Sequence, residues 1–271
     1  MNIKNFMKID NEKPLDNFVI NGGLCSIFKT IGCIGDSLSS GALVTFENNK
    51  PGYIQDFNYS WGQFMARDTG AKVYNFSECG LNAYEYIGFA QKNGYFAKEL
   101  ACQAYIIALG VNDIGGIVKG NGEFGDITDI NLSDSADNKP TFSGHIGGII
   151  SRYKEIEHDA KFFLVTMPKS KVDDEINGYY DMHQKLMHQI AEIFNNCYVV
   201  DLRKYAPFYD DEFKRNFYLE DHMNASGYRV TALMIESYID YIIRNNPEDF
   251  IQPDLSVRGI TTHIIKDKIN F

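Results

Sequence analysis

The feature that most constrains the fold is an alternation of short apolar segments with longer segments of helical periodicity. The short segments are rich in β-branched and aromatic residues, which is typical of strands covered on both faces of a sheet. The predicted strands are 28–35, 72–77, 104–110, 161–168 and 197–202. The predicted helices are 60–68, 83–100, 146–158 and 177–195. This order predicts an α/β fold with a parallel, doubly wound five-stranded sheet between helices on both faces.

A last helix is predicted after the sequence "NASG", because apolar residues recur there at helical spacing from Val230 to Ile242 and Pro247 ends the run. No internal repeat, low-complexity tract or linker interrupts the chain. We therefore expect a single domain over residues 1–271. Its core spans about 28–246, and the pattern does not predict the course of the C-terminal tail, 247–271.

One stretch, 113–145, does not fit the alternation, because it is polar and dotted with glycine. A loop of this length inside a compact domain is usually functional or disordered. Its aspartates do not have the spacing of an EF-hand, so a solvated acidic loop is expected rather than a calcium site. They are Asp126, Asp129, Asp134 and Asp137. Our hypothesis is that this loop lies over the sheet edge beside Asn112 and shapes a substrate pocket.

Three residues suited to acyl chemistry follow three predicted strands. Ser37 in "IGDSL" follows the first strand, Gly80 in "SECGLN" the second and Asn112 in "GVND" the third. Glycine, aspartate, serine and asparagine also favour turns for local backbone reasons, so each position alone is consistent with an ordinary turn. Because ligands bind outside the carboxyl ends of parallel strands, their joint placement predicts a site at that edge.

A serine nucleophile needs a base within hydrogen-bond reach, and the chain offers six histidines. His222, in "YLEDHMNASGY", precedes the final helix, where its ring can reach back over the sheet edge. The other histidines are interpreted as surface or packing residues; His183 and His188, five apart on one predicted helix, have the wrong spacing for a shared metal face. These other histidines are His145, His158, His183, His188 and His263.

The ordered set resembles the SGNH (GDSL) hydrolases. Ser37 in GDSL, Gly80, Asn112 in GVND and the late His222 match the four signature positions of that family in order and approximate spacing. The resemblance covers the span from the first strand to the final helix. It implies a three-layer α/β/α, flavodoxin-like fold and a serine esterase without metal or organic cofactor. Its substrates would be esters, often acetyl groups on carbohydrates, or lipids.

The resemblance also implies a role for each matched residue. Ser37 would attack the ester carbonyl, while His222 accepts its proton and later returns it to the leaving alcohol. The backbone N–H groups of Ser37 and Gly80 and the side-chain amide of Asn112 would form the oxyanion hole. Glycine lets the backbone approach the substrate without a Cβ. Removing one such donor typically costs about 10²–10³ in rate.

The chain departs from the family at one position. The family usually carries an aspartate three residues before the histidine, and here that residue is Leu219. A backbone carbonyl near Leu219 would leave a Ser–His dyad, Glu220 or Asp221 would supply a displaced carboxylate, or the chain is a non-catalytic binding relative. Replacing a charged by a neutral acceptor costs about 1 kcal/mol, which an enzyme tolerates. The dyad is therefore favoured, with Glu220 as the next candidate.

Composition limits the kinds of binding partner and the cellular environment that we expect for the protein. A net charge of -10 argues against nucleic acid or an anionic membrane as the main partner. The first residues lack the unbroken apolar core of a secretory signal. Five cysteines without a CxxC pair favour a reducing, cytoplasmic environment.

The sequence thus predicts a cytoplasmic esterase that acts on a small-molecule ester, with deacetylation of a carbohydrate or glycoside favoured. A longer-chain acyl esterase, lysophospholipase or thioesterase is the alternative. The sequence does not indicate an oligomeric state.

Overall fold

The fold was obtained as a computed structural model that describes residues 6–48 and 50–251. Five parallel strands form the central sheet in the order β4-β1-β5-β6-β7. Counted along these five strands, the order is 2-1-3-4-5, which is the flavodoxin-like arrangement. The strands are β1 (Thr30–Gly35), β4 (Lys72–Asn75), β5 (Ala104–Ala108), β6 (Lys161–Val165) and β7 (Cys197–Val200). The predicted fold class and all five predicted strands are confirmed.

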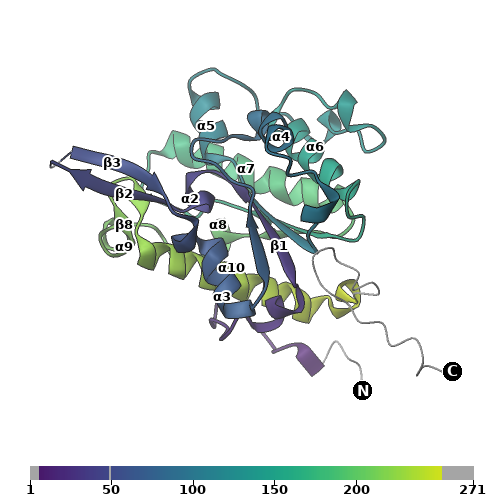
Figure 1. The fold of residues 1–271 in the computed structure, drawn as a ribbon, viewed down its shortest axis with the longest axis horizontal. Helices are drawn as coiled ribbons and strands as arrows, with labels where there is room; N and C mark the ends of the chain where they lie inside the picture. The colour runs from purple at the N-terminus through teal and green to yellow at the C-terminus, as the bar shows by residue number, and fades with distance from the viewer. Residues whose placement is uncertain (1–5, 49, 252–271) are drawn as a thin grey trace.

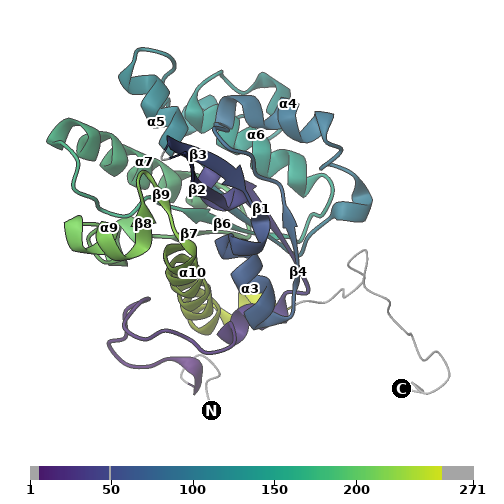
Figure 2. The ribbon, with the colours of Figure 1, turned by 60° about the vertical axis from the view of Figure 1, so that its left-hand side comes forward.

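Helices cover both faces of this sheet (Figure 1). On one face, α4 (Ala83–Lys92), α6 (Phe142–Lys154) and α7 (Asp174–Ile193) enclose one apolar cluster. On the other, α3 (Trp61–Thr69) and α10 (Ala225–Asn245) enclose the second cluster, with fully buried Trp61, Met65 and Met234. Figure 2 shows the same three layers from the side of the β2–β3 hairpin. Because the strands are covered on both faces, their near-continuous apolar runs are explained.

An antiparallel hairpin, β2 (Ala42–Glu47) and β3 (Lys50–Gln55), extends away from the body of the molecule (Figure 1). It follows the four-residue helix α2 (Ser37–Ser40) directly. Its exposed faces carry Phe46, Tyr53 and Ile54, which are about half exposed. The sequence analysis did not predict this hairpin. A second, very short hairpin, β8 (Tyr218–Leu219) and β9 (His222–Met223), lies before α10.

The stretch 113–145 is only in part the solvated acidic loop that the sequence predicted, because Asp126, Asp134 and Asp137 are exposed but both ends of the stretch are helical. It overlaps the end of α5 (Val111–Val118) and the first turn of α6, with two short 3₁₀ turns between them, Ile127–Asp129 and Ser135–Asp137. Asp129 is buried, where it pairs with Lys139 at 2.7 Å and accepts a hydrogen bond from Thr141 at 3.0 Å. The buried Asp129 therefore anchors the middle of the segment, because Lys139 and Thr141 satisfy its carboxylate.

Two helices begin or end at other residues than the sequence predicted, because capping residues set their boundaries. The expected helix 83–100 ends at Lys92, since Asn93 and the positive φ of Gly94 (71°) terminate it, and Lys98–Leu100 forms a separate 3₁₀ turn. The helix expected from residue 146 begins at Phe142, because the Thr141 side chain accepts the Gly144 N–H. Two further short helices, α8 (Leu202–Tyr205) and α9 (Asp211–Phe217), follow β7.

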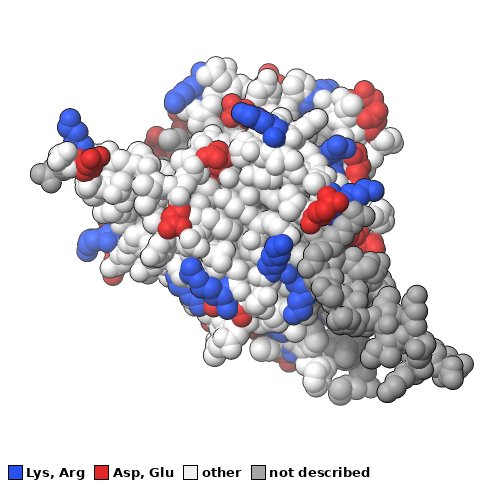
Figure 3. All heavy atoms as spheres, in the orientation of Figure 1, with Lys and Arg blue, Asp and Glu red and all other residues white. Residues whose placement is uncertain are grey.

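The beginning of the tail packs on the core. Pro247–Phe250 forms a 3₁₀ turn whose Phe250 ring is buried against Phe28 and Tyr198. The remainder of the predicted tail, 252–271, lies outside the described residues. No helix within the described ranges is long and apolar enough to cross a membrane. On the face shown in Figure 3, lysine and arginine are separated by wide uncharged areas and by acidic residues.

Candidate active site

Ser37 is the first residue of α2, two residues after β1 ends. The buried Asp36 caps this helix, because its carboxylate accepts the Leu38 N–H at 3.0 Å. Burial raises the pKa of the Asp36 carboxyl to about 7. The Ser37 N–H has no hydrogen-bond acceptor among the described residues. A helix start therefore presents both a hydroxyl and an unpaired donor at the carboxyl end of β1.

Gly80 lies in the loop after β4, with φ of 79°, a conformation that favours glycine. Its N–H also has no acceptor in the part of the chain that the structure describes. The loop is fixed to the nucleophile segment by Ser77, whose hydroxyl donates to the Cys33 carbonyl at 2.9 Å and lies 2.8 Å from the Ser39 hydroxyl. The Gly80 donor is thereby held at the same sheet edge as Ser37.

Asn112 is the second residue of α5, directly beyond β5. One N–H of its side-chain amide donates to the Leu81 carbonyl at 3.0 Å, and the other has no partner in residues 6–48 and 50–251. The Asp113 carboxylate accepts the Ala83 N–H at 2.9 Å. These two bonds join α5 to the loop of Gly80. Since β1 and β5 are neighbours at the point where the strand order reverses, Ser37 and Asn112 flank the topological switch point.

His222 begins β9, after a tight turn at Glu220 and Asp221. Its Nδ1 lies 3.0 Å from Asp221 Oδ1. A carboxylate only accepts hydrogen bonds, so Nδ1 carries the proton and Nε2 is the basic nitrogen. His222 is partly buried, whereas the Asp221 side chain is 62% exposed. The hydrogen bond to His222 lowers the pKa of Asp221, which is therefore ionised at neutral pH.

Asp221 is not one of the two groups that the sequence analysis ranked first for orienting His222, which were a backbone carbonyl near Leu219 and the Glu220 side chain. Neither Leu219 nor Glu220 forms a hydrogen bond to the His222 ring in the described structure. Glu220 occupies the left-handed turn position with φ of 54°, and Leu219 pairs with His222 across the short hairpin. The turn directs Asp221, the third candidate, toward Nδ1.

Tyr53 was missed by the sequence analysis. It projects from β3 and its hydroxyl donates to Asp221, at 3.1 Å from both carboxylate oxygens. Its ring lies edge-on to His222, with ring centroids 5.2 Å apart. The available signal was the alternating pattern of residues 42–55 around "ENNK", which is typical of a hairpin.

The exposed Cys79 precedes Gly80 in the loop after β4, and its N–H donates to Gln55 Oε1 of β3 at 3.0 Å. Burial, followed by the Glu78 carboxylate, raises the pKa of its thiol. The charges of Asp36 and Asp221 raise it further, and a hydrogen bond with the Ser37 side chain opposes them. No hydrogen bond joins Ser37 Oγ to His222 within the described residues; such bonds often form only with substrate bound.

The other described histidines are hydrogen-bonded within the fold or exposed, except for one that lines a cavity. His183 is buried with its Nε2 3.2 Å from the Leu109 carbonyl, His188 bonds Asp201 at 2.9 Å, and His158 is exposed. His145 lines a cavity beside Asn112. His263 lies outside the described residues. Among residues 6–48 and 50–251, no group of three metal-binding side chains is found.

Comparisons with known proteins show the family of the chain. Residues 33–230 match the GDSL-like Lipase/Acylhydrolase family, and the chain belongs to this family. Membership identifies it as a hydrolase of ester bonds. No curated protein matches the chain.

Solved structures share the fold at low sequence identity. A family two carbohydrate esterase from Clostridium thermocellum, in complex with cellohexaose, is 14% identical with a TM-score of 0.54 over 82% of this chain and 65% of its own. A family 2 carbohydrate esterase with a carbohydrate-binding domain from Corynascus thermopiles is 16% identical, with a TM-score of 0.53 over 79% and 66%. A Parabacteroides merdae protein described as a GDSL-like lipase is 15% identical, with a TM-score of 0.52 over 77% and 94%.

Proposed function

We propose that the chain is a serine esterase that removes small acyl groups, acetyl above all, from a carbohydrate or glycoside. Ser37 Oγ attacks the ester carbonyl, its proton passes to His222 Nε2, and the carbonyl electron pair becomes an oxyanion. Collapse of this intermediate expels the alcohol, which takes the proton from His222. Water then gives a proton to His222 Nε2 and attacks the acyl-serine, the bond from the acyl carbon to Ser37 Oγ breaks, the carboxylic acid leaves, and the proton passes from His222 to Ser37 Oγ.

The observation that carries this proposal is the set of unpaired donors at one edge of the sheet. The N–H groups of Ser37 and Gly80 and one amide N–H of Asn112 have no acceptor among the described residues. They follow three adjacent strands, β1, β4 and β5. Donors fixed before reaction stabilise a developing oxyanion without reorganisation, which is the largest single contribution in many acyl-transfer enzymes.

Asp221 completes the set as the group that orients His222, in place of the dyad favoured from sequence. Its carboxylate fixes the tautomer in which Nε2 accepts the Ser37 proton, and it stabilises the imidazolium that follows. This assignment removes the sequence-based reason to consider a non-catalytic relative, because the missing aspartate at Leu219 is replaced by a neighbour in the same turn.

A small acyl group is supported by a cavity of about 80 Å³ whose lining includes Asp36 and Leu38, the residues on either side of Ser37 in the chain. Its walls are mostly apolar and include Leu38, Val111, Val165 and Met167. Pockets for larger ligands usually measure roughly 300–1,000 Å³. Long acyl chains of the kind carried by lysophospholipids therefore do not fit this cavity.

Two assays test the proposal. A fluorophosphonate probe should label the wild-type protein and fail to label Ser37→Ala; labelling of Ser37→Ala to the same extent would overturn the role of Ser37. On p-nitrophenyl esters of increasing chain length, kcat/KM should be highest for acetate. A maximum at octanoate or beyond would instead support the longer-chain esterase or thioesterase.

For the cellular environment, we propose the cytoplasm. All five cysteines are free, and four of them are buried, as expected where thiols stay reduced. The substrate remains a small-molecule ester, with no nucleic acid or membrane as partner. Detection of the protein in a secreted fraction would contradict this.

A further inference from the structure

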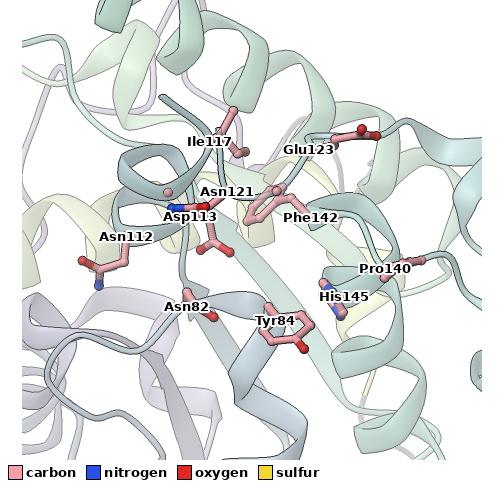
Figure 4. A pocket seen from close by; sticks show the side chains of 12 residues that line it. Asn82, Tyr84, Asn112, Asp113, Ile117, Asn121, Glu123, Pro140, Phe142 and His145 are labelled. Atoms are coloured by element: carbon pink, nitrogen blue, oxygen red, sulfur yellow. The ribbon is translucent and has the colours of Figure 1, made fainter. Parts of the chain in front are cut away.

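A second, larger cavity adjoins the oxyanion donors. It measures about 430 Å³ and lies among the starts of α4, α5 and α6 (Figure 4). Its walls include Asn82, Tyr84, Asn112, Asp113, Phe142 and His145. Part of the wall comes from the segment 113–145, which the sequence analysis expected beside Asn112.

The position of Asn112 relates this cavity to the reaction. Asn112 stands at one end of it, apart from the aromatic side chains and His145 at the other (Figure 4). The preceding residue, Val111, lines the small apolar cavity instead. The consecutive residues 111 and 112 therefore line the two cavities, and we place the acyl group of the ester in the small apolar cavity and its alcohol in the larger polar one.

The polar atoms of the larger cavity indicate what it accepts. Asp113 Oδ2 and His145 Nε2 are buried without a hydrogen-bond partner among the described residues. Leaving such a group unpaired typically costs about 1–3 kcal/mol, so a bound hydroxyl that pairs with either is favoured. Burial raises the pKa of Asp113 to about 6, so this carboxyl remains an acceptor at neutral pH.

The charge of the lining excludes an anionic alcohol. Asp113 and Glu123 contribute carboxylates, and the lining contains neither lysine nor arginine. A phosphate or carboxylate on the alcohol would therefore be repelled. Uncharged hydroxyl groups match the carboxylate, amide and imidazole groups that are present.

An aromatic surface completes the cavity. The Tyr84 side chain is 69% exposed, and its ring meets His145 edge-on, with centroids 5.1 Å apart. An exposed aromatic ring at the mouth of a polar cavity offers an apolar face to the C–H side of a sugar ring, while the cavity behind it accepts the hydroxyl groups. Phe142 adds a second, buried aromatic wall.

We infer that this cavity is the alcohol subsite of the enzyme and that it holds one uncharged sugar ring. Tyr84 packs on the ring, and Asp113 and His145 pair with its hydroxyl groups. This inference rests on the proposed serine esterase. It assigns a binding site to the alcohol part of the ester, whereas the small cavity was assigned to the acyl part.

The test compares two acetate esters that differ only in their alcohol, a monoacetylated methyl xyloside and p-nitrophenyl acetate. For Tyr84→Ala, the ratio of kcat/KM for the xyloside ester to kcat/KM for p-nitrophenyl acetate should fall about tenfold, mainly through KM, as is usual when a contact aromatic is truncated. Tyr84→Phe should keep most of this ratio, because it retains the ring. His145→Ala should lower the ratio as well.

A matched control is Tyr59→Ala, because Tyr59 is also exposed (45%) but lies outside the cavity lining. An unaltered ratio in Tyr84→Ala, or an equal fall in Tyr59→Ala, would overturn the inference. Faster hydrolysis of acetylcholine than of the xyloside ester would also overturn it, in favour of a cationic alcohol.

Activity measurements distinguish a failure of the sugar subsite from a failure of the serine esterase. If the wild-type protein hydrolyses p-nitrophenyl acetate but no acetylated glycoside, the sugar subsite is wrong and the serine esterase stands. If Ser37→Ala retains full activity on p-nitrophenyl acetate, the proposed function itself is wrong.

Discussion

Replacing Asp221 by asparagine should slow the enzyme only modestly, and the geometry sets the size of the effect. Asp221 Oδ1 is 3.0 Å from His222 Nδ1 and 3.1 Å from the Tyr53 hydroxyl, so one oxygen accepts both hydrogen bonds. An asparagine whose carbonyl oxygen takes this position preserves both bonds and the tautomer of His222. The large losses seen on amide substitution of a buried triad acid, about 10⁴ in kcat, come from the wrong tautomer and should not occur here.

What Asp221→Asn removes is the charge. A hydrogen bond to a charged group contributes roughly 1.5–3 kcal/mol and a neutral one roughly 0.5–1.5 kcal/mol, so the difference is about 1–1.5 kcal/mol. Solvent screens the side chain of Asp221, which is 62% exposed, and this places the effect at the lower end. The expected loss in kcat is therefore about five- to tenfold. Asp221→Ala removes the bond as well and should cost about 10–100-fold.

Initial rates on p-nitrophenyl acetate, with Glu220→Gln as the control, measure this prediction. Glu220→Gln changes the same charge one residue away and makes no bond to the ring, so its kcat should stay within about twofold of wild type. A loss of 10³ or more in Asp221→Asn would show that the tautomer argument is wrong. Equal losses in Asp221→Asn and Glu220→Gln would remove Asp221 from its orienting role.

Three further outcomes are expected. Asn112→Ala should lower kcat on p-nitrophenyl acetate about 10²–10³-fold while circular dichroism stays unchanged, and a loss under threefold would remove its amide from the oxyanion hole. Iodoacetamide at pH 9 should inactivate the wild-type protein by alkylating exposed Cys79 beside Ser37, and Cys79→Ala should resist; equal inactivation of both would contradict this. Burial raises the pKa of fully buried Glu236 to about 8, so the folded state loses stability as pH rises from about 4.5 to 8. Glu236→Gln should therefore raise the free energy of unfolding in urea on the order of 3 kcal/mol at pH 9 and leave it unchanged at pH 4; a gain at both pH values would refute the titration argument.

The sheet was predictable because both of its faces are buried. Strands such as Ile31–Ile34 and Ala104–Ile107 are fully covered, so selection for apolar residues leaves a continuous signal. The flavodoxin-like order of the strands was implied by the resemblance to the SGNH hydrolases, and it brings Ser37 and Asn112 to neighbouring strand ends.

Elements outside that core were not predictable in the same way. The hairpin of Tyr53 projects into solvent, and Pro51 within it weakens any strand prediction. Helix α5 is eight residues long and contains Gly115 and Gly116, which lower helix propensity. Whether Glu220 or Asp221 faces His222 depends on the left-handed backbone at residue 220, which no sequence pattern encodes.

The projecting hairpin β2–β3 separates part of the proposed catalytic apparatus from the central sheet. The Ser37 hydroxyl and the three N–H donors follow strands of the central sheet. His222 and Asp221 belong to the short hairpin β8–β9, and Tyr53 belongs to the hairpin β2–β3. Substitutions at exposed positions of these two hairpins would alter the proposed proton-transfer groups and leave the oxyanion donors in place, whereas Ala42, Val44 and Met223 anchor the hairpins in the core. Rate and fold can thus be tuned on separate parts of one small scaffold.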